Sequence, residues 1–156
     1  MYKNNDMRLK PKYIIVFVLM LASSAMYAQA DLKINSIFEK YGKQKGAVMV
    51  VLSGKSKELK NYGLNQYRSL TINYDKAIFN DIQNSLETDK KNATKIKEVV
   101  ANGVISSGYY QLRDDNTQLI RYILFKVDDN HKATLIYMVG DEDSEETIDN
   151  MFLKRK

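Results

Sequence analysis

The sequence predicts an α+β domain: an antiparallel-rich sheet that ends in a three-strand meander, with helices packed on at least one face. Two observations predict this class. Apolar stripes with helical spacing alternate with short apolar runs typical of strands, and the last three such runs are joined by short, turn-rich connections. No internal repeat, low-complexity tract or linker interrupts residues 31–156, so we expect one domain there.

The first 30 residues have the pattern of a secretory signal peptide. Charged residues up to Lys12 precede an apolar run over 13–22, and Ala28-Gln29-Ala30 supplies an A-x-A cleavage site. We place cleavage after Ala30, with Ala28 as the alternative. The apolar run falls well short of the ~20 residues that a spanning helix needs. We therefore expect an exported protein, periplasmic or extracellular, with no transmembrane anchor after cleavage.

The first helix and strand of the domain follow directly from their apolar residues. Ile34, Ile37, Phe38 and Tyr41 form one stripe, which predicts a helix over 33–41 that Gly42 ends. The run over 47–52 is apolar throughout, which is typical of a strand covered on both faces. We expect that strand to be central in the sheet.

The next segments alternate between turns, a strand and a helix. A short helical turn over 57–62 ends at Gly63, and Leu70, Ile72 and Tyr74 then alternate with polar residues. This alternation predicts a strand with one solvated face. Asp75 is expected to cap a helix whose apolar stripe consists of Ile78, Phe79, Ile82 and Leu86.

Residues 90–102 fit two structures. Asp89 can cap a helix that carries Ala93, Ile96 and Val100 on one face and ends at Gly103. Asn102-Gly103 between apolar residues is instead a hairpin signal. We favour the helix, because Asp89-Lys90-Lys91 is typical of a helix start and no turn-rich segment precedes it.

The C-terminal third predicts the meander and a closing helix. Strands are expected over 105–113, 118–127 and 133–139, joined by Asp- and Asn-rich turns, so neighbours should pair antiparallel. Asp143, with Glu146 at capping-box spacing, is expected to begin a helix. Ile148, Met151 and Phe152 should face inward.

Three segments carry a resemblance to known proteins. They are FEKY at 38–41 with Gly46 and the apolar strand, SGYYQL at 107–112, and LIYMVGD at 135–141 before the last helix. Together they resemble a family of small exported proteins of gut bacteria that is classed as a domain of unknown function. The resemblance spans 32–153 and implies an exported α+β domain. It brings no catalytic residue, cofactor or substrate.

The composition argues against several function classes. The whole chain carries a net charge of +5, but residues 31–156 keep only 20 basic against 18 acidic residues, so we expect no nucleic-acid partner. The chain has no cysteine and one histidine. Disulfides, a lipid-attachment thiol and classical zinc or copper sites are therefore not expected, and neither is a cofactor.

Two motifs that mimic catalytic or phosphate-binding sites have simpler interpretations. His131 lies in a turn rich in Asp and Asn, and nothing places a nucleophile beside it. Gly54-Lys55-Ser56 mimics the end of a phosphate loop, but Met49 stands where the loop needs its first glycine.

Acidic residues before and within the last helix could supply oxygen ligands to calcium. Asp141, Asp143, Glu145 and Glu146 are the candidates. A helix-loop-helix calcium loop, however, needs a glycine where Glu146 stands and a bidentate acid where Phe152 stands. Acids in a first helical turn also stabilise the positive end of the helix dipole, which is the simpler interpretation.

Residues 31–156 contain eight tyrosines and no tryptophan, and four of these tyrosines are the candidate ligand-binding residues. These are Tyr109, Tyr110, Tyr122 and Tyr137, three of which could share a sheet face and form an exposed cluster for a protein or sugar. The alternative, to which we give more weight, is cross-strand packing beneath a helix.

These observations favour a non-enzymatic, exported or envelope-associated binding module that uses a sheet face or groove. Its partner would be an unknown envelope protein or a glycan. The alternative is a small carboxylate-dependent hydrolase of the periplasm, which needs two acids ~5–10 Å apart in a concave pocket and a raised pKa on one of them. No acid interrupts an apolar strand or stripe, which argues against an enzyme.

Overall fold

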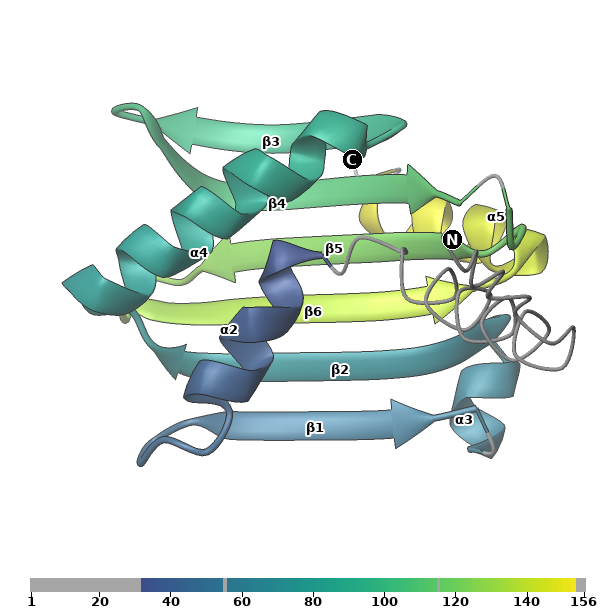
Figure 1. Ribbon diagram of the computed structural model, residues 1–156, viewed down its shortest axis with the longest axis horizontal. Coiled ribbons are helices and arrows are strands. Elements are labelled where there is room, and N and C mark those ends of the chain that lie inside the picture. The colour runs from purple at the N-terminus through teal and green to yellow at the C-terminus, as the bar shows by residue number, and fades with distance from the viewer. Residues whose placement is uncertain (1–31, 55, 115, 154–156) are drawn as a thin grey trace, which may run out of the picture. The chain divides into compact units, whose positions relative to one another are not determined.

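A six-stranded antiparallel sheet organises the chain in the computed structural model (Figure 1). The structure describes residues 32–54, 56–114 and 116–153, so the signal-peptide prediction lies outside the described residues. The described helices and strands are, in order, α2 (Lys33–Tyr41), β1 (Val48–Ser53), α3 (Lys57–Lys60), β2 (Leu64–Asn73), α4 (Lys76–Asp89), the 3₁₀ turn η2 (Lys90–Asn92), β3 (Lys95–Ala101), β4 (Val104–Arg113), β5 (Ile120–Val127), β6 (Lys132–Gly140) and α5 (Glu142–Phe152).

The strand order is β1-β2-β6-β5-β4-β3. The last strand, β6, inserts between β2 and β5, and every neighbouring pair is antiparallel. The predicted α+β class and the meander of β4, β5 and β6 are confirmed. The edges of the sheet are β1 and β3.

Helices lie on both faces of this sheet (Figure 1). On one face, α2 and α4 cover a core that includes Phe38, Ile82 and Tyr110. On the other, α3 and α5 cover a smaller core built around Leu59, Tyr122 and Ile148. No helix within the described ranges is long and apolar enough to cross a membrane.

Several predicted elements are confirmed. The predicted helix over 33–41 is α2, with all four stripe residues buried. Asp75 caps α4, accepting hydrogen bonds from the backbone N–H groups of Ala77 and Ile78, both at 3.0 Å. The strand predicted near Leu70 begins earlier, at Leu64, and β5 begins at Ile120 rather than at residue 118.

The prediction that the apolar run over 47–52 is a central strand is wrong. It forms β1, which is an edge strand that pairs only with β2 among the described strands. Val48 is 64% and Val51 56% exposed. A continuous apolar run is also compatible with an uncovered strand, and the sheet order that decides between the two is set by long-range pairing.

The predicted helix over 90–102 is also wrong, and the hairpin alternative is right. Residues 95–101 form β3, which turns into β4 through Asn102 (φ 53°) and Gly103 (φ 76°). Two consecutive positive φ angles are the geometry for which Asn-Gly turns are favoured. Asp89 ends α4 and does not cap a following helix.

Asp89 instead caps α2, which precedes it by more than 50 residues. Its two carboxylate oxygens accept hydrogen bonds from the backbone N–H groups of Lys33 and Ile34, each at 2.8 Å. Leu32, at the N-cap position, supplies no side-chain cap. The buried carboxylate therefore satisfies the start of one helix from the end of another.

The closing helix begins differently from the prediction. Asp141, not Asp143, is its cap, because the Asp141 side chain accepts a hydrogen bond from the Asp143 N–H at 3.1 Å. Ile148 faces inward as expected, but Met151 is 40% exposed.

Close backbone contact fixes the start of α5 against the turn before β2. A Cβ atom on Gly140 would lie 2.7 Å from the Gly63 carbonyl oxygen and would also collide with the Ser144 hydroxyl. The Asp141 N–H donates to the same Gly63 carbonyl at 3.2 Å. Only glycine fits at residue 140 without displacing these groups.

Candidate functional site

The sheet face beneath α5 is only partly covered by the described residues, and two of the hollows on it adjoin each other. Both are lined by Ile136 of β6 and by Phe152 at the end of α5. The smaller, of about 300 Å³, lies between α3 and α5 and is lined by residues such as Leu59 and Tyr62. The larger has a volume of about 470 Å³. We call this larger hollow the groove.

The groove has an apolar floor and a polar rim. Tyr109, Leu124, Ile136 and Phe152 line it, from β4, β5, β6 and α5 respectively. Ser107 and Thr134 add hydroxyl groups. Its volume falls within the roughly 300–1,000 Å³ that is typical of small-molecule sites.

Two lysines provide the positive charge of the groove. Lys97 and Lys126, both exposed, belong to β3 and β5. Lys97 donates a long hydrogen bond of 3.4 Å to the Leu153 carbonyl oxygen. Neither lysine forms a salt bridge with a residue in the described part of the chain, so both ammonium groups can meet an anion.

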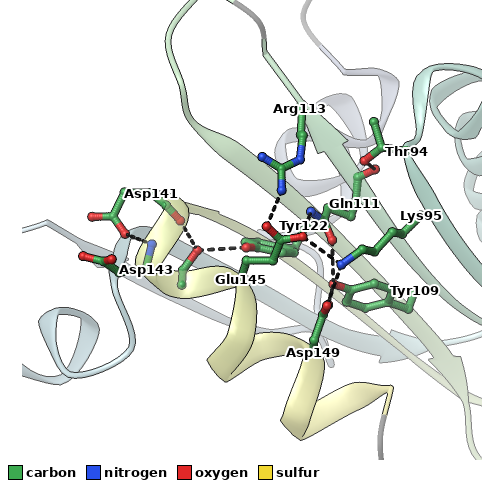
Figure 2. Close-up of polar contacts among 11 residues, drawn as sticks. Thr94, Lys95, Tyr109, Gln111, Arg113, Tyr122, Asp141, Asp143, Glu145 and Asp149 are labelled. Carbon is green, nitrogen blue, oxygen red and sulfur yellow. Dashed lines mark hydrogen bonds and ion pairs between the residues drawn. The ribbon is translucent and has the colours of Figure 1, made fainter.

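A polar cluster attaches α5 to the β3–β4 side of the sheet (Figure 2). Glu145 and Asp149, one helical turn apart, both pair with Lys95, whose Nζ lies 2.7 Å from Glu145 Oε1 and 2.6 Å from Asp149 Oδ2. Gln111 Nε2 donates to Glu145 Oε1 at 3.0 Å, and Arg113 pairs with Glu145 Oε2. Five side chains from three elements thus form one network.

The cluster holds Glu145 in its charged form. Hydrogen bonds from Gln111 and then from Lys95 lower the pKa of Glu145 to about 2. The Asp149 and Glu145 carboxylates raise the pKa of Lys95. A general acid needs a raised pKa, so Glu145 lacks the property on which the hydrolase alternative depends.

The expectation of an exposed tyrosine cluster is wrong, because all four candidate rings are buried. The exposed fractions are 4% for Tyr109, 0% for Tyr110, 0% for Tyr122 and 7% for Tyr137. Tyr109 and Tyr122 pack in the core beneath α5, with ring centroids 6.4 Å apart, whereas Tyr110 and Tyr137 pack in the core beneath α2 and α4. Adjacent residues of a strand point to opposite faces, so Tyr109 and Tyr110 cannot share one.

The hydroxyl groups of Tyr109, Tyr110 and Tyr122 form hydrogen bonds within the fold. Tyr109 donates to Asp149 Oδ1 at 2.9 Å, and Tyr110 donates to Glu98 Oε1 at 2.7 Å. The Tyr122 hydroxyl lies 2.8 Å from the Ser144 hydroxyl. Burial is the main cause that raises the pKa of Tyr109 and of Tyr110. Of the four, only Tyr109 lines the groove, and it does so as part of the floor.

The other motifs lie apart from the groove lining. His131 has φ 55° in a turn where Asp128 Oδ1 accepts from the N–H groups of Asn130 and Lys132, both at 2.9 Å. Ser56 caps α3, while Lys55 lies outside the described residues. No group of three or more potential metal-ligating side chains occurs within residues 32–54, 56–114 and 116–153.

Sequence patterns do not identify the groove lysines, because Lys97 lies within the predicted helix over 90–102 and Lys126 resembles any surface lysine. One signal was present. In the hairpin alternative, Lys95, Lys97 and Val99 alternate on one face of a strand. That alternation places Lys97 beside the Tyr109 position.

Comparisons with known proteins give a family without an assigned activity. No curated protein matches the chain. A crystal structure of a protein of unknown function from Pseudomonas aeruginosa, PA94, is similar over 72% of this chain and 80% of that one, with 9% identity and a TM-score of 0.35. The model of a family described as "Family of unknown function (DUF6108)" matches residues 21–152. The chain belongs to this family of unknown function, DUF6108.

Proposed function

We propose that the protein is an exported, non-enzymatic binding module that holds an elongated apolar molecule with one anionic group in the groove. A fatty acid or another acyl chain with a carboxylate has this chemistry. The observation that supports the proposal is an apolar hollow of about 470 Å³ with two lysines among its lining residues.

The apolar floor would bind the chain of such a ligand. Leu124 and Ile136, from the two central strands β5 and β6, are joined there by the ring of Phe152. Each CH₂ group that these side chains remove from water contributes up to about 0.8 kcal/mol. An open groove suits a chain laid along the surface better than a compact ligand.

The rim lysines would select the charge of the ligand. Lys97 and Lys126 flank an apolar surface, and neither has an acidic partner among the described residues. Their ammonium groups would therefore attract a carboxylate, whereas an uncharged head group would gain no such attraction. The acidic pair Glu145 and Asp149 is already occupied by Lys95 and Arg113. It therefore does not neutralise the groove.

Export is part of the same proposal and rests on residues 1–30. A basic start, an apolar run and Ala28-Gln29-Ala30 are the features of a cleaved signal peptide. Cell fractionation and the mass of the purified protein test it. A protein that stays in the cytoplasm with residues 1–30 attached would refute export and leave the groove proposal standing.

The binding test compares two probes of equal chain length, decanoate and the uncharged decyl maltoside, by titration calorimetry. We expect decanoate to bind more tightly. The double variant Lys97→Gln/Lys126→Gln should weaken decanoate binding about two- to thirtyfold, because each of the two exposed ion pairs contributes about 0.2–1 kcal/mol. Binding of decyl maltoside should not change.

The control is a second double variant with the same net charge as Lys97→Gln/Lys126→Gln. Lys76→Gln/Lys91→Gln removes two exposed lysines at the ends of the α4–η2 segment, which packs on the opposite face of the sheet. Decanoate affinity should not change in this variant. Equal weakening in both double variants would indicate attraction by net charge alone and would refute binding in the groove. The absence of binding of either probe would refute it as well.

A further inference from the structure

Exposed apolar side chains gather on the two edge strands of the sheet. Six of the eight large hydrophobic residues that are exposed in the described part of the chain lie there: Val48, Val50, Val51, Ile96, Val99 and Val100. An edge strand also presents unpaired backbone N–H and C=O groups. Among the described strands no further strand pairs with β1 or β3, so each edge combines apolar side chains with backbone groups open to pairing.

Only one of the two edges lacks the usual protection against pairing. The β3 strand carries Lys95, Lys97 and Glu98, and a bulge interrupts its register with β4 at Val99/Val100. Charges and bulges are the common devices that prevent edge-to-edge contact. The β1 strand, VMVVLS, has neither charge nor proline, and its register with β2 is regular over all six residues.

The exposed valines of β1 lie on both faces of the sheet. Val50 shares a face with Leu52, which packs against the core beneath α5, whereas Val51 shares a face with Met49, which packs against the core beneath α2. Val50 is 42% and Val51 56% exposed. A strand that covers this edge must be apolar on both of its faces.

We infer that β1 is the contact of a homodimer, in which two copies pair their β1 strands antiparallel across a two-fold axis. The β1 strand itself is the uncharged strand, apolar on both faces, that this edge requires. Pairing of β1 with β3 of another copy would place valines beside lysines and would extend without closing. Pairing of β1 with β1 closes after two copies.

The symmetry fixes which residues meet. Opposite residues of an antiparallel pair carry side chains on the same face. A two-fold axis perpendicular to the sheet therefore places one residue near the centre of β1 opposite its own copy, and this residue is Val50 or Val51. Their Cα atoms would then be about 4.5–5.5 Å apart, which is within the range that a disulfide can bridge.

The first test is sedimentation velocity on the protein purified after expression of the full chain, over a wide concentration range. We expect a species of twice the monomer mass that increases with concentration. Val50→Lys should weaken dimerisation at least about tenfold, because like charges would meet at or beside the axis. Val99→Lys, at a 55% exposed position of β3, should leave it unchanged.

Far-UV circular dichroism and urea midpoints check that both lysine variants fold. A protein that stays monomeric at the highest concentrations would overturn the inference. Equal loss of the dimer in the β1 and β3 variants would also overturn it, as would open-ended oligomers that Val99→Lys abolishes.

The second test uses the absence of cysteine from the chain. Val50→Cys, Val51→Cys and Val99→Cys each introduce one thiol, and crosslinking is followed under mild oxidation. We expect Val50→Cys or Val51→Cys to form a covalent dimer much faster than Val99→Cys. If neither β1 variant crosslinks faster than the β3 variant, the paired strands are not at β1.

Discussion

Replacing Asp89 by alanine tests how strongly α2 depends on a carboxylate that lies more than 50 residues away in the chain. Each carboxylate oxygen accepts one backbone N–H of the first turn of α2 at 2.8 Å, and Asp89 is only 4% exposed. Hydrogen bonds to charged groups contribute about 1.5–3 kcal/mol each, and removing a cap costs about 1–2 kcal/mol. Because two bonds share one group, we expect a total loss of about 2–4 kcal/mol.

Urea unfolding followed by circular dichroism measures this loss. The matched control is Asp75→Ala, which removes a cap of the same chemistry that is exposed and local to α4. We expect the control to lose about 1 kcal/mol. If Asp89→Ala loses no more than Asp75→Ala, the buried contact between the two helices does not stabilise the fold as argued.

Three further predictions concern the closing helix, a glycine and the buried tyrosines. The lowered pKa of Glu145, about 2 against 4.5 when unfolded, stabilises the fold above pH 4.5, and this stability is lost as the pH falls toward 2. Urea unfolding over this range should show a loss of about 1–2 kcal/mol that Glu145→Gln removes. Gly140→Ala should lower the free energy of unfolding by about 2–4 kcal/mol, because the added Cβ collides with its neighbours. Gly103→Ala should lower it by only about 1 kcal/mol, because a Cβ there meets nothing within 4 Å and only the positive φ is strained. Thermal unfolding of the two variants tests this difference. Burial raises the pKa of Tyr109 and Tyr110 above 10, so the stability that they contribute is present below pH 10 and lost above it; ultraviolet titration should show their ionisation only as the protein unfolds.

Local patterns predicted the elements that local forces determine. The stripe of α2 and the glycine after it gave the bounds of that helix, and Asp75 was identified as the cap of α4 from its position alone. The meander followed from turn residues such as Asp128, whose side chain accepts backbone hydrogen bonds in the β5–β6 turn. In each case the interacting groups lie within a few residues of one another.

The errors arose where distant residues decide the outcome. The β1 strand is at an edge because β6, the last strand, takes the other side of β2. Ile96 and Val100 fit a helical stripe, but pairing with β4 makes their segment a strand. The groove was not predictable for the same reason, since Lys97, Lys126 and Phe152 come together only after the sheet is ordered and α5 lies across it.

The contact between Gly140 and the Gly63 carbonyl has a consequence for comparing members of the family. Any sequence that keeps this chain path from β6 into α5 must keep a residue without a side chain at 140 and a small one at 144, whatever it binds. An alignment would therefore show a strongly retained Gly-Asp pair that records steric necessity at residue 140 and capping of α5 at residue 141. Evidence for or against the proposed ligand is to be sought in how positions 97, 126 and 136 vary, where the backbone imposes no such constraint.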